Sequence, residues 1–299
     1  MRANLPEPVV VFGGSGSVGH LLIERWNADT VPVVVVDRVA TDDPLTSRVV
    51  IGDICAPSDD VSEALRNAAI VVLALPESVA LGALPIVAGL LAPTALLVET
   101  LSVKSRFGQQ FARVQPQPQC VGINPMFAPS LGMVGRPIAA VVHHSGQSVS
   151  EFLDTLTRWG SHVIQLGADA HDRRCAATQA LTHATVLAFG LALSDLERDT
   201  QDRHIPNTAL ATPPHALILA LLARIGGGTP AVYSDIQTAN PYAAQARKAM
   251  ATALTELSDV ADRGSAQEFG ELMSRALSPL GGNVDDYAAV CARLIEVLP

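Results

Sequence analysis

The stretch VVVFGGSGSVGHLL, residues 9–22, determines the fold that we expect for the first half of the chain. An apolar β-branched run leads into a GxGxxG pattern, and helix-forming residues follow at once. In this context Gly14 permits a tight turn, Gly16 lets the backbone approach a pyrophosphate, and Gly19 lets the helix pack closely on the strand. The helix N-terminus then faces the phosphates. We therefore predict a dinucleotide site here, with a glycine-rich turn that binds no ligand as the alternative.

The next predicted strand, 32–37, indicates which dinucleotide binds. It ends at Asp37, whose carboxylate can accept hydrogen bonds from ribose hydroxyls and would repel a 2′-phosphate, which favours NAD. Arg38 follows at once and could hold that phosphate, so NADP stays the alternative. The candidate cofactor-binding residues are Gly14, Ser15, Gly16, Ser17, Val18, Gly19, Asp37, Arg38 and, at the end of a later strand, Leu75 and Pro76.

The rest of the first half alternates apolar runs with helical segments. We predict strands at 8–13, 32–37, 69–75, 95–100, 120–126, 137–144 and 162–166, and helices at 17–27, 78–91 and 148–160. Most of the strand segments are apolar throughout, as expected for parallel strands that helices cover on both faces. The pattern predicts a doubly wound, Rossmann-like α/β domain over residues 1–166.

The second half has a different character. Residues 169–197 have helical periodicity, and the Ala- and Leu-rich sequence beyond them is broken at 211–215 and 224–230. We predict an all-α domain over residues 167–299. Because its apolar helices carry few charges on any face, we expect burial against a second copy of the chain in a homodimer. A thick monomeric core is the alternative.

Composition excludes several classes of protein. With 299 residues, 48% of them hydrophobic and 16% charged, the chain can bury a sizeable core. A net charge of −9 without any basic run argues against nucleic-acid binding. The longest apolar run, 83–98, is too short and too interrupted by proline to span a membrane, and we identify no signal peptide, so we expect a soluble, cytoplasmic protein. The four cysteines lack metal-binding spacing, which predicts reduced structural thiols and no metal site.

Four phrases resemble one family. LLVETLSVKS (96–105) and GINPMFAPSLG (122–132) are similar to the (V)D-x-x-SVK and HPMFGP phrases of the prephenate/arogenate dehydrogenases. HDRRCAATQALTHATVLAFGLALSD (171–195) resembles the first helix of their dimerisation domain, and YSDI (233–236) matches a later helix. The resemblance covers most of the chain in order. It implies an NAD-dependent oxidative decarboxylation, in which a cyclohexadienyl acid loses hydride from ring C4 and carbon dioxide from C1.

The resemblance also implies site residues. Ser102, from SVK, would hydrogen-bond near the substituent on C4, and His183 would lie in the substrate pocket. Gln179, one helical turn before His183, is a further candidate for that pocket. Core packing is the alternative for both helical residues.

Two residues that the family uses are missing. The histidine that accepts a proton is replaced by Asn124, and the arginine that binds a substrate carboxylate falls on Tyr242. Arg247, five residues further on, lies on another helical face but remains a candidate. Lys104 and Arg136 are further candidates for the ring carboxylate, as is a residue of a second subunit.

The loss of the histidine favours an amine substrate. When C4 carries a hydroxyl, hydride loss creates a protonated carbonyl, and a base contributes about 10²–10⁴-fold to such a step. When C4 carries a neutral amine, the nitrogen lone pair stabilises the carbon as an iminium, and no proton has to leave. Asn124 can accept an N–H from that amine. We therefore predict a 4-amino-4-deoxyprephenate dehydrogenase. The alternatives are a prephenate or arogenate dehydrogenase with a displaced base, His183 being the foremost candidate, and a non-catalytic NAD-binding sensor.

Structural roles compete with these functional ones. Asn124 could cap the turn after its strand, and Lys104 could be a solvated surface charge. His171-Asp172 opens a helix, where the carboxylate favours the helix dipole, so we expect a capping role there. We expect His143, His144 and His204 at the surface.

Overall fold

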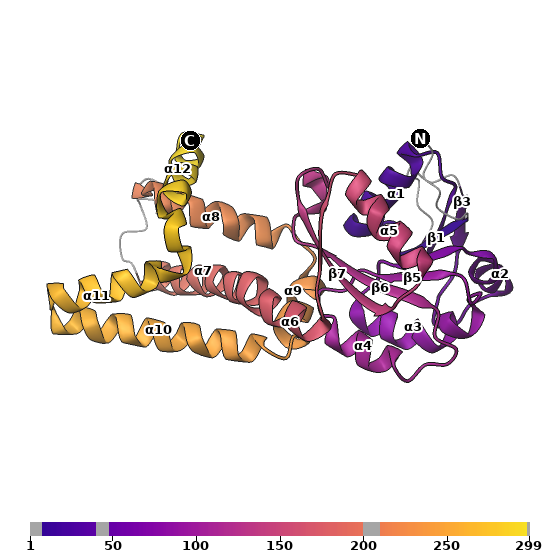
Figure 1. Ribbon diagram of the computed structural model, residues 1–299. Coiled ribbons are helices and arrows are strands. Elements are labelled where there is room, and N and C mark those ends of the chain that lie inside the picture. The colour runs from indigo at the N-terminus through magenta and orange to yellow at the C-terminus, as the bar shows by residue number, and fades with distance from the viewer. Residues whose placement is uncertain (1–7, 40–47, 200–209, 298–299) are drawn as a thin grey trace. The chain divides into compact units, whose positions relative to one another are not determined.

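The computed structural model describes residues 8–39, 48–199 and 210–297. The chain divides into two compact units, Met1–Cys175 and Ala176–Pro299 (Figure 1). The sequence changes character after residue 166, whereas the division follows Cys175. The reason is that the first helix beyond Gly167, α6 (Ala168–Cys175), packs against elements of the first unit.

The described part of unit 1 is built on an eight-stranded sheet in the order β3-β2-β1-β4-β5-β6-β7-β8. The predicted Rossmann-like fold is confirmed. The strands are β1 (Val9–Phe12), β2 (Val33–Asp37), β3 (Arg48–Ile51), β4 (Ile70–Leu73), β5 (Leu96–Glu99), β6 (Gln119–Pro125), β7 (Pro137–His144) and β8 (His162–Gln165). The sequence did not predict β3, a short edge strand with partly exposed side chains.

One pair of strands departs from the parallel arrangement. β7 runs antiparallel to β6, while every other neighbouring pair is parallel among the described strands. The connection between β6 and β7 contains only a short 3₁₀ turn, Pro129–Leu131, and a parallel crossover needs a longer connection, usually a helix. Apolar runs do not encode strand direction, so the sequence alone could not give this reversal.

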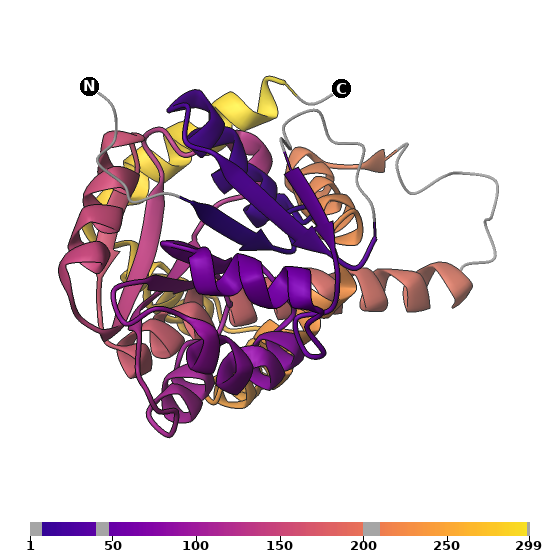
Figure 2. The ribbon, with the colours of Figure 1, turned by 90° about the vertical axis from the view of Figure 1, so that its right-hand side faces the viewer.

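Helices cover both faces of the sheet (Figure 2). Side chains of α1 and α5 pack with Val9 and Val11 on one face, and side chains of α2, α3 and α4 pack with Val10 and Phe12 on the other. Successive residues of β1 thus enter opposite cores, which explains why the strand is apolar throughout. The helices are α1 (Ser17–Ala28), α2 (Asp59–Asn67), α3 (Glu77–Leu90), α4 (Ser105–Phe111) and α5 (Gln147–Arg158).

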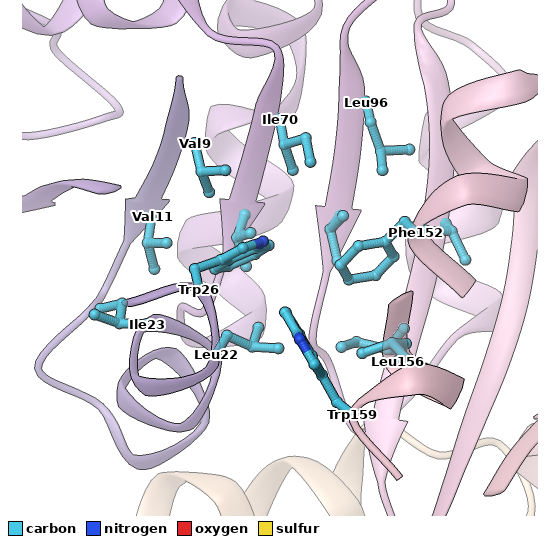
Figure 3. Packing of buried hydrophobic residues seen from close by; sticks show 14 of the residues in the cluster. Val9, Val11, Leu22, Ile23, Trp26, Ile70, Leu96, Phe152, Leu156 and Trp159 are labelled. Atoms are coloured by element: carbon cyan, nitrogen blue, oxygen red, sulfur yellow. The ribbon is translucent and has the colours of Figure 1, made fainter. Parts of the chain in front are cut away.

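An aromatic cluster fills the core between α1, α5 and the sheet (Figure 3). The ring centroid of Trp26 lies 5.7 Å from that of Trp159, edge to face, and 6.2 Å from that of Phe152. Trp159 donates its indole N–H to Asp29 at 2.8 Å. Each such aromatic pair contributes about 0.5–1.5 kcal/mol beyond the area it buries. Both tryptophans of the chain lie here, so tryptophan fluorescence reports on the unfolding of unit 1.

The described part of unit 2 is helical, as predicted. A π-helical turn, Ala176–Ala180, joins α6 to α7 within the helix expected at 169–197. Proline begins both α8 and α9, a position where its missing N–H costs nothing. The helices are α7 (Leu181–Asp199), α8 (Pro213–Gly226), α9 (Pro230–Thr238), α10 (Ala243–Arg263), α11 (Ala266–Leu277) and α12 (Val284–Ile295), with a 3₁₀ segment at Ser278–Asn283.

The turn after β1 depends on Gly13, which has a φ of +78° and no room for a Cβ beside the carbonyl of Ala74. We expect Gly13→Ala to lower the free energy of unfolding by at least ~2 kcal/mol, because the left-handed conformation alone costs an L residue roughly 1–2 kcal/mol. Gly89→Ala in α3 is the matched control. An added Cβ there meets no neighbour within 4 Å, so alanine should stabilise the helix by about 0.5–1 kcal/mol. Urea unfolding followed by tryptophan fluorescence measures both, and equal effects would contradict the prediction.

Candidate active site

The glycine-rich turn follows β1 directly. A Cβ at Gly14 would lie 2.7 Å from the side chain of Val35, and one at Gly19 would lie 2.5 Å from the carbonyl oxygen of Gly13. The sequence assigned the tight turn to Gly14, but the left-handed residue is Gly13, and Gly14 instead allows a close approach to β2. A Cβ at Gly16 would lie 3.3 Å from the carbonyl oxygen of Gly13, which is a tight contact, and the residue itself is exposed, so a side chain here would crowd the turn and cover its surface.

The first turn of α1 fits an anionic group. Its N-cap, Gly16, provides no side chain to satisfy the first N–H groups, and no acidic residue lies in that turn. Ser15, Gly16 and Ser17 are exposed, and Val18 is half-buried. Unsatisfied N–H groups and the helix dipole attract phosphate. The chemistry of this loop therefore suits a dinucleotide pyrophosphate.

The other predicted cofactor-binding residues follow neighbouring strands at the same edge of the sheet. Asp37 ends β2, and its Oδ1 accepts the backbone N–H of Arg38 at 2.7 Å. Leu75 lies beside the turn, because a Cβ at Gly13 would come within 3.1 Å of its Cδ2. Pro76 is the N-cap of α3. Ligands bind at this edge, the carboxyl ends of the strands, in open α/β sheets.

The loop that carries Ser102, residues 100–104, is held by a buried ion pair. Lys104 Nζ lies 2.7 Å from Glu99 Oε2 and donates to the carbonyl oxygen of Ile123 at 2.9 Å. His143 Nε2 lies 3.1 Å from the other oxygen of Glu99. Burial raises the pKa of Glu99, but Lys104 and His143 lower it by more, so the carboxyl pKa is below its ordinary value. Burial lowers the pKa of Lys104, and Glu99 offsets part of that effect.

These contacts correct two predictions. Lys104 is wholly buried, so a solvated surface charge is wrong, and its ammonium group is bound by Glu99 and Ile123 instead of being presented to a substrate. The side chain of His143, expected at the surface, is buried against Glu99. Gly122 makes the arrangement possible, because a Cβ there would collide with Glu99. A carboxylate that ends an apolar strand was the signal in the sequence for this cluster.

Asn124 lies near the end of β6 in a buried polar chain. Its Nδ2 is 3.1 Å from Nε2 of His171, and Nδ1 of His171 is 2.8 Å from Oδ1 of Asp172. The exposed fractions of the three residues are 4%, 1% and 0%. The sequence predicted a capping role for His171-Asp172, and it missed the contact with Asn124.

Asp172 joins this chain to the Ser102 loop. Its Oδ1 accepts the N–H of Lys104 at 2.9 Å, and its Oδ2 accepts the N–H of Ser105 at 3.0 Å. Although burial opposes ionisation, hydrogen bonds from His171, Ser105 and Lys104 hold the carboxyl pKa of Asp172 below its ordinary value. Helix α6, strand β6 and the loop after β5 are thereby fixed to one another.

In unit 2, two predicted pocket residues carry unsatisfied polar atoms. Oε1 of Gln179 and Nδ1 of His183 are buried with no hydrogen-bond partner among the described residues. The ring of His183 packs edge-on against Tyr233, with centroids 4.9 Å apart. Burial, together with Arg224, lowers the pKa of His183. An unpaired buried polar atom is costly, so these two are suited to binding a ligand.

The remaining predicted residues lie near the start of α10. Tyr242 is its N-cap, with its N–H donated to Asn240 Oδ1 at 2.9 Å. Arg247 donates to the carbonyl oxygen and to Oε1 of Gln237, at 2.7 and 2.8 Å. Gln237 in turn donates to the carbonyl oxygen of Ala180 at 2.7 Å. Arg247 is therefore tied to the π-helical turn that contains Gln179.

No metal centre is found in the described part of the chain, where no group of three or more His, Cys, Asp and Glu side chains could hold an ion. The four cysteines form no disulfide. Burial raises the pKa of Cys175, next to His171, to about 11, so its thiol is neutral. His204 lies outside the described residues.

The lowered pKa of Asp172 predicts a loss of stability in acid. An Asp carboxyl in the unfolded chain has a pKa of about 3.9, and the folded value is lower, so the stabilisation is present above roughly pH 4 and disappears as the pH falls through the folded value. Asp172→Asn should reduce the slope of unfolding free energy against pH below about pH 4. Urea unfolding at several pH values, followed by tryptophan fluorescence, measures this slope, and an unchanged slope would count against the role of the carboxylate.

Comparisons with known proteins identify the family of the chain. Residues 167–275 match the family described as prephenate dehydrogenase, dimerization domain. The chain is 43% identical over 289 residues to 4-amino-4-deoxyprephenate dehydrogenase of Streptomyces pristinaespiralis, covering 97% of this chain and 96% of that protein. It is 28% identical over 236 residues to the T-protein of Enterobacter agglomerans, covering 77% of this chain and 56% of that protein.

Solved structures share the fold. Prephenate dehydrogenase from A. aeolicus, in complex with hydroxyphenyl propionate and NAD+, matches with a TM-score of 0.72 at 16% identity, covering 91% of this chain and 97% of that one. Synechocystis arogenate dehydrogenase matches with a TM-score of 0.67 at 19% identity, covering 93% and 99%. With these likenesses in fold and the 43% identity to 4-amino-4-deoxyprephenate dehydrogenase along almost its whole length, the chain belongs to the prephenate dehydrogenase family.

Proposed function

We propose that this chain oxidises 4-amino-4-deoxyprephenate with NAD, releasing carbon dioxide and forming 4-aminophenylpyruvate. The observation that carries the proposal is the replacement of the family's proton-accepting histidine by Asn124, a buried amide in a network without a free base. The name of the relative with 43% identity supports the same substrate.

The cofactor proposal rests on the loop after β1. The exposed backbone at Gly16 and the uncapped first turn of α1 suit a pyrophosphate, and Asp37 at the end of β2 suits unmodified ribose hydroxyls. When bound, NAD supplies an acceptor for the hydride that leaves ring C4. Arg38 stays the residue through which NADP could bind instead.

In this proposal, the side chains orient the ring rather than move protons. Asn124 accepts an N–H of the C4 amine through Oδ1, and the hydroxyl of Ser102, in the partly buried loop after β5, hydrogen-bonds near the same group. The amine lone pair supports the carbon that loses hydride, and loss of carbon dioxide from C1 then returns electrons to the ring as it becomes aromatic. The neutral side chain of Asn124 helps, since a charged imidazolium at this position would repel the developing iminium.

We assign the substrate's carboxylates to the helical unit. Arg247 carries a guanidinium that Gln237 holds beside the π-helical turn, and it is our candidate for the role of the missing arginine at Tyr242. Gln179 and His183, with their unsatisfied buried atoms, lie in the same unit as Arg247 and are further candidates for binding substrate. Arg136 is less suitable, because its guanidinium donates to the nearby carbonyl oxygen of Val134.

A displaced base is the rival proposal, with prephenate or arogenate as substrate. His171 is the histidine nearest to Asn124 among the described residues, but Asn124 and Asp172 contact its two ring nitrogens and only 1% of the residue is exposed. His183 has a lowered pKa, which weakens it as a base. Neither histidine supports a hydroxylated substrate as well as Asn124 supports an amine substrate.

The helical unit supports a homodimer. Its buried apolar cluster contains the small side chains of Ala180 and Ala243 with Ile236, while Leu191, Met273 and Tyr287 are 70%, 52% and 59% exposed. Apolar surface on several helices is typical of a subunit interface. The match to a dimerization domain over residues 167–275 agrees with this proposal.

We further propose that the enzyme is cytoplasmic and binds neither membrane nor nucleic acid. Among the described residues, one helical stretch, Ala168–Arg198, is long and apolar enough to cross a membrane by length and composition. The dimerization-domain match spans that stretch, so a second subunit accounts for its apolar side chains. The net charge of −9 disfavours contact with phosphate backbones.

A direct assay tests the substrate. NAD reduction and carbon dioxide release should accompany oxidation of the amino compound, with kcat/KM at least ~100-fold above that for prephenate. Asn124→His should raise prephenate turnover by about 10-fold or more, since it restores a base.

Asn124→Leu is the matched control, because it removes the acceptor without supplying a base. It should slow oxidation of the amino compound and leave prephenate turnover low. Equal rates of the unaltered enzyme on both compounds would overturn the proposal. Binding of NAD without turnover of either would support a non-catalytic sensor.

The oligomeric state tests the interface. Light scattering after size exclusion should give twice the mass of one chain. Leu191→Glu with Met273→Glu should weaken dimerisation by at least ~100-fold, because both carboxylates would be buried unpaired. Ser194→Glu with Ser274→Glu adds the same charge on the same two helices at exposed polar positions and should stay dimeric. A monomeric unaltered chain would contradict the proposal.

A further inference from the structure

The donors and acceptors in the buried hydrogen-bonded chain Asn124–His171–Asp172 can be assigned, starting from Asp172. Asp172 accepts hydrogen bonds from the backbone of Lys104 and Ser105, and its lowered pKa keeps it a carboxylate. A carboxylate can only accept. Nδ1 of His171, 2.8 Å away, must therefore carry a hydrogen.

The tautomer of His171 then determines how Asn124 is oriented. With the hydrogen on Nδ1, Nε2 is the ring nitrogen left to accept a hydrogen bond. The amide nitrogen of Asn124 lies 3.1 Å from that atom and donates to it. The thiol of Cys175, 3.7 Å from the same amide nitrogen, is neutral and can also accept. Oδ1 of Asn124 receives no hydrogen bond from any residue in the described ranges.

We propose that His171, with its tautomer set by Asp172, is a positioning residue that turns the carbonyl oxygen of Asn124, and not its amide nitrogen, toward the substituent on ring C4. This inference rests on the proposed function, because it concerns how an amine substrate is held.

The orientation matters because the two ends of the amide have opposite effects on the amine. An oxygen accepts an N–H and leaves the nitrogen lone pair free to support the carbon that loses hydride. A reversed amide would donate an N–H to that lone pair and compete with the ring for it. The reversed amide would therefore bind the substrate but slow hydride loss, so its effect should appear in kcat more than in KM.

The position of Asp172 makes the orientation rigid. Its two oxygens are fixed by consecutive N–H groups at the start of α4, and Lys104 of that pair is buried and paired with Glu99. The imidazole therefore cannot turn without breaking its contacts with Asp172 and Asn124.

Kinetics on the full-length enzyme test the proposal. His171→Leu removes the acceptor and should lower kcat for the amino compound by at least ~10-fold with KM changed less than ~3-fold. His171→Gln offers an amide oxygen near the same place and should recover most of the loss. Leu156→Ala in α5 is the control for destabilisation, because Leu156 is a fully buried core residue on another helix, and it should leave kcat unchanged.

A double-mutant cycle separates positioning from simple structural support. If His171 acts through Asn124, then His171→Leu should have little further effect on kcat in the Asn124→Leu background. An equal loss in both backgrounds would overturn the proposal.

Nitrogen NMR of the free enzyme with labelled histidine rings gives a test that needs neither a variant nor a substrate. We expect His171 to be neutral with its hydrogen on Nδ1. A hydrogen on Nε2 would refute the proposed orientation of Asn124. If the enzyme fails to oxidise the amino compound but shows the expected tautomer, the proposed substrate is wrong while the orientation of Asn124 stands.

Discussion

The ion pair between Lys104 and Glu99 is the constraint on which the rest of the site depends. Removing two charges from water costs several kcal/mol per ion, and the cost is offset only when the remaining hydrogen-bonding capacity is satisfied. That condition is met here. The carboxylate of Glu99 also contacts Nε2 of His143 and accepts the N–H of Leu101, and the ammonium of Lys104 also donates to the carbonyl oxygen of Ile123. Because Ile123 precedes Asn124, and the backbone of Lys104 holds Asp172, the pair fixes three segments at once. Gly122 is part of the same constraint, since any side chain there would displace Glu99.

This rigid frame explains how one position can decide the chemistry. The loop with Ser102, the end of β6 and the start of α6 are held by groups that do not include the side chain of Asn124. A base or an amide at position 124 therefore enters the same surroundings. In the proposed function, specificity between a hydroxyl and an amine at ring C4 depends on the protonation chemistry of that side chain.

Much of the fold could be predicted from the sequence, because continuous apolar runs and the GxGxxG turn reflect local constraints. The edge strand β3 was missed because RVVI is short and half exposed, and the reversal at β7 was missed because an apolar run carries no direction.

The site was less predictable than the fold. Asn124 and Ser102 stand in recognisable phrases, but the contact of Asn124 with His171 joins residues 47 positions apart. Lys104 resembled a surface charge because its partner is identified only once β5, β6 and the loop between them are placed together.

An amide needs such a frame more than a histidine does. The two ends of a carboxamide have nearly the same shape, so packing alone does not distinguish them, and only hydrogen bonding does. A correctly made bond contributes about 0.5–1.5 kcal/mol, while the reversed amide would place its oxygen against the bare Nε2 and lose about 1–3 kcal/mol more. Since roughly 1.4 kcal/mol corresponds to a tenfold ratio, the two effects together favour one orientation by about 10- to 1,000-fold. A histidine whose Nδ1 hydrogen is held by a carboxylate provides that asymmetry, because only Nε2 is then left to accept from the amide. The replacement of a base by Asn124 and the burial of His171 against Asp172 are thus two parts of one requirement: an uncharged acceptor that cannot turn around.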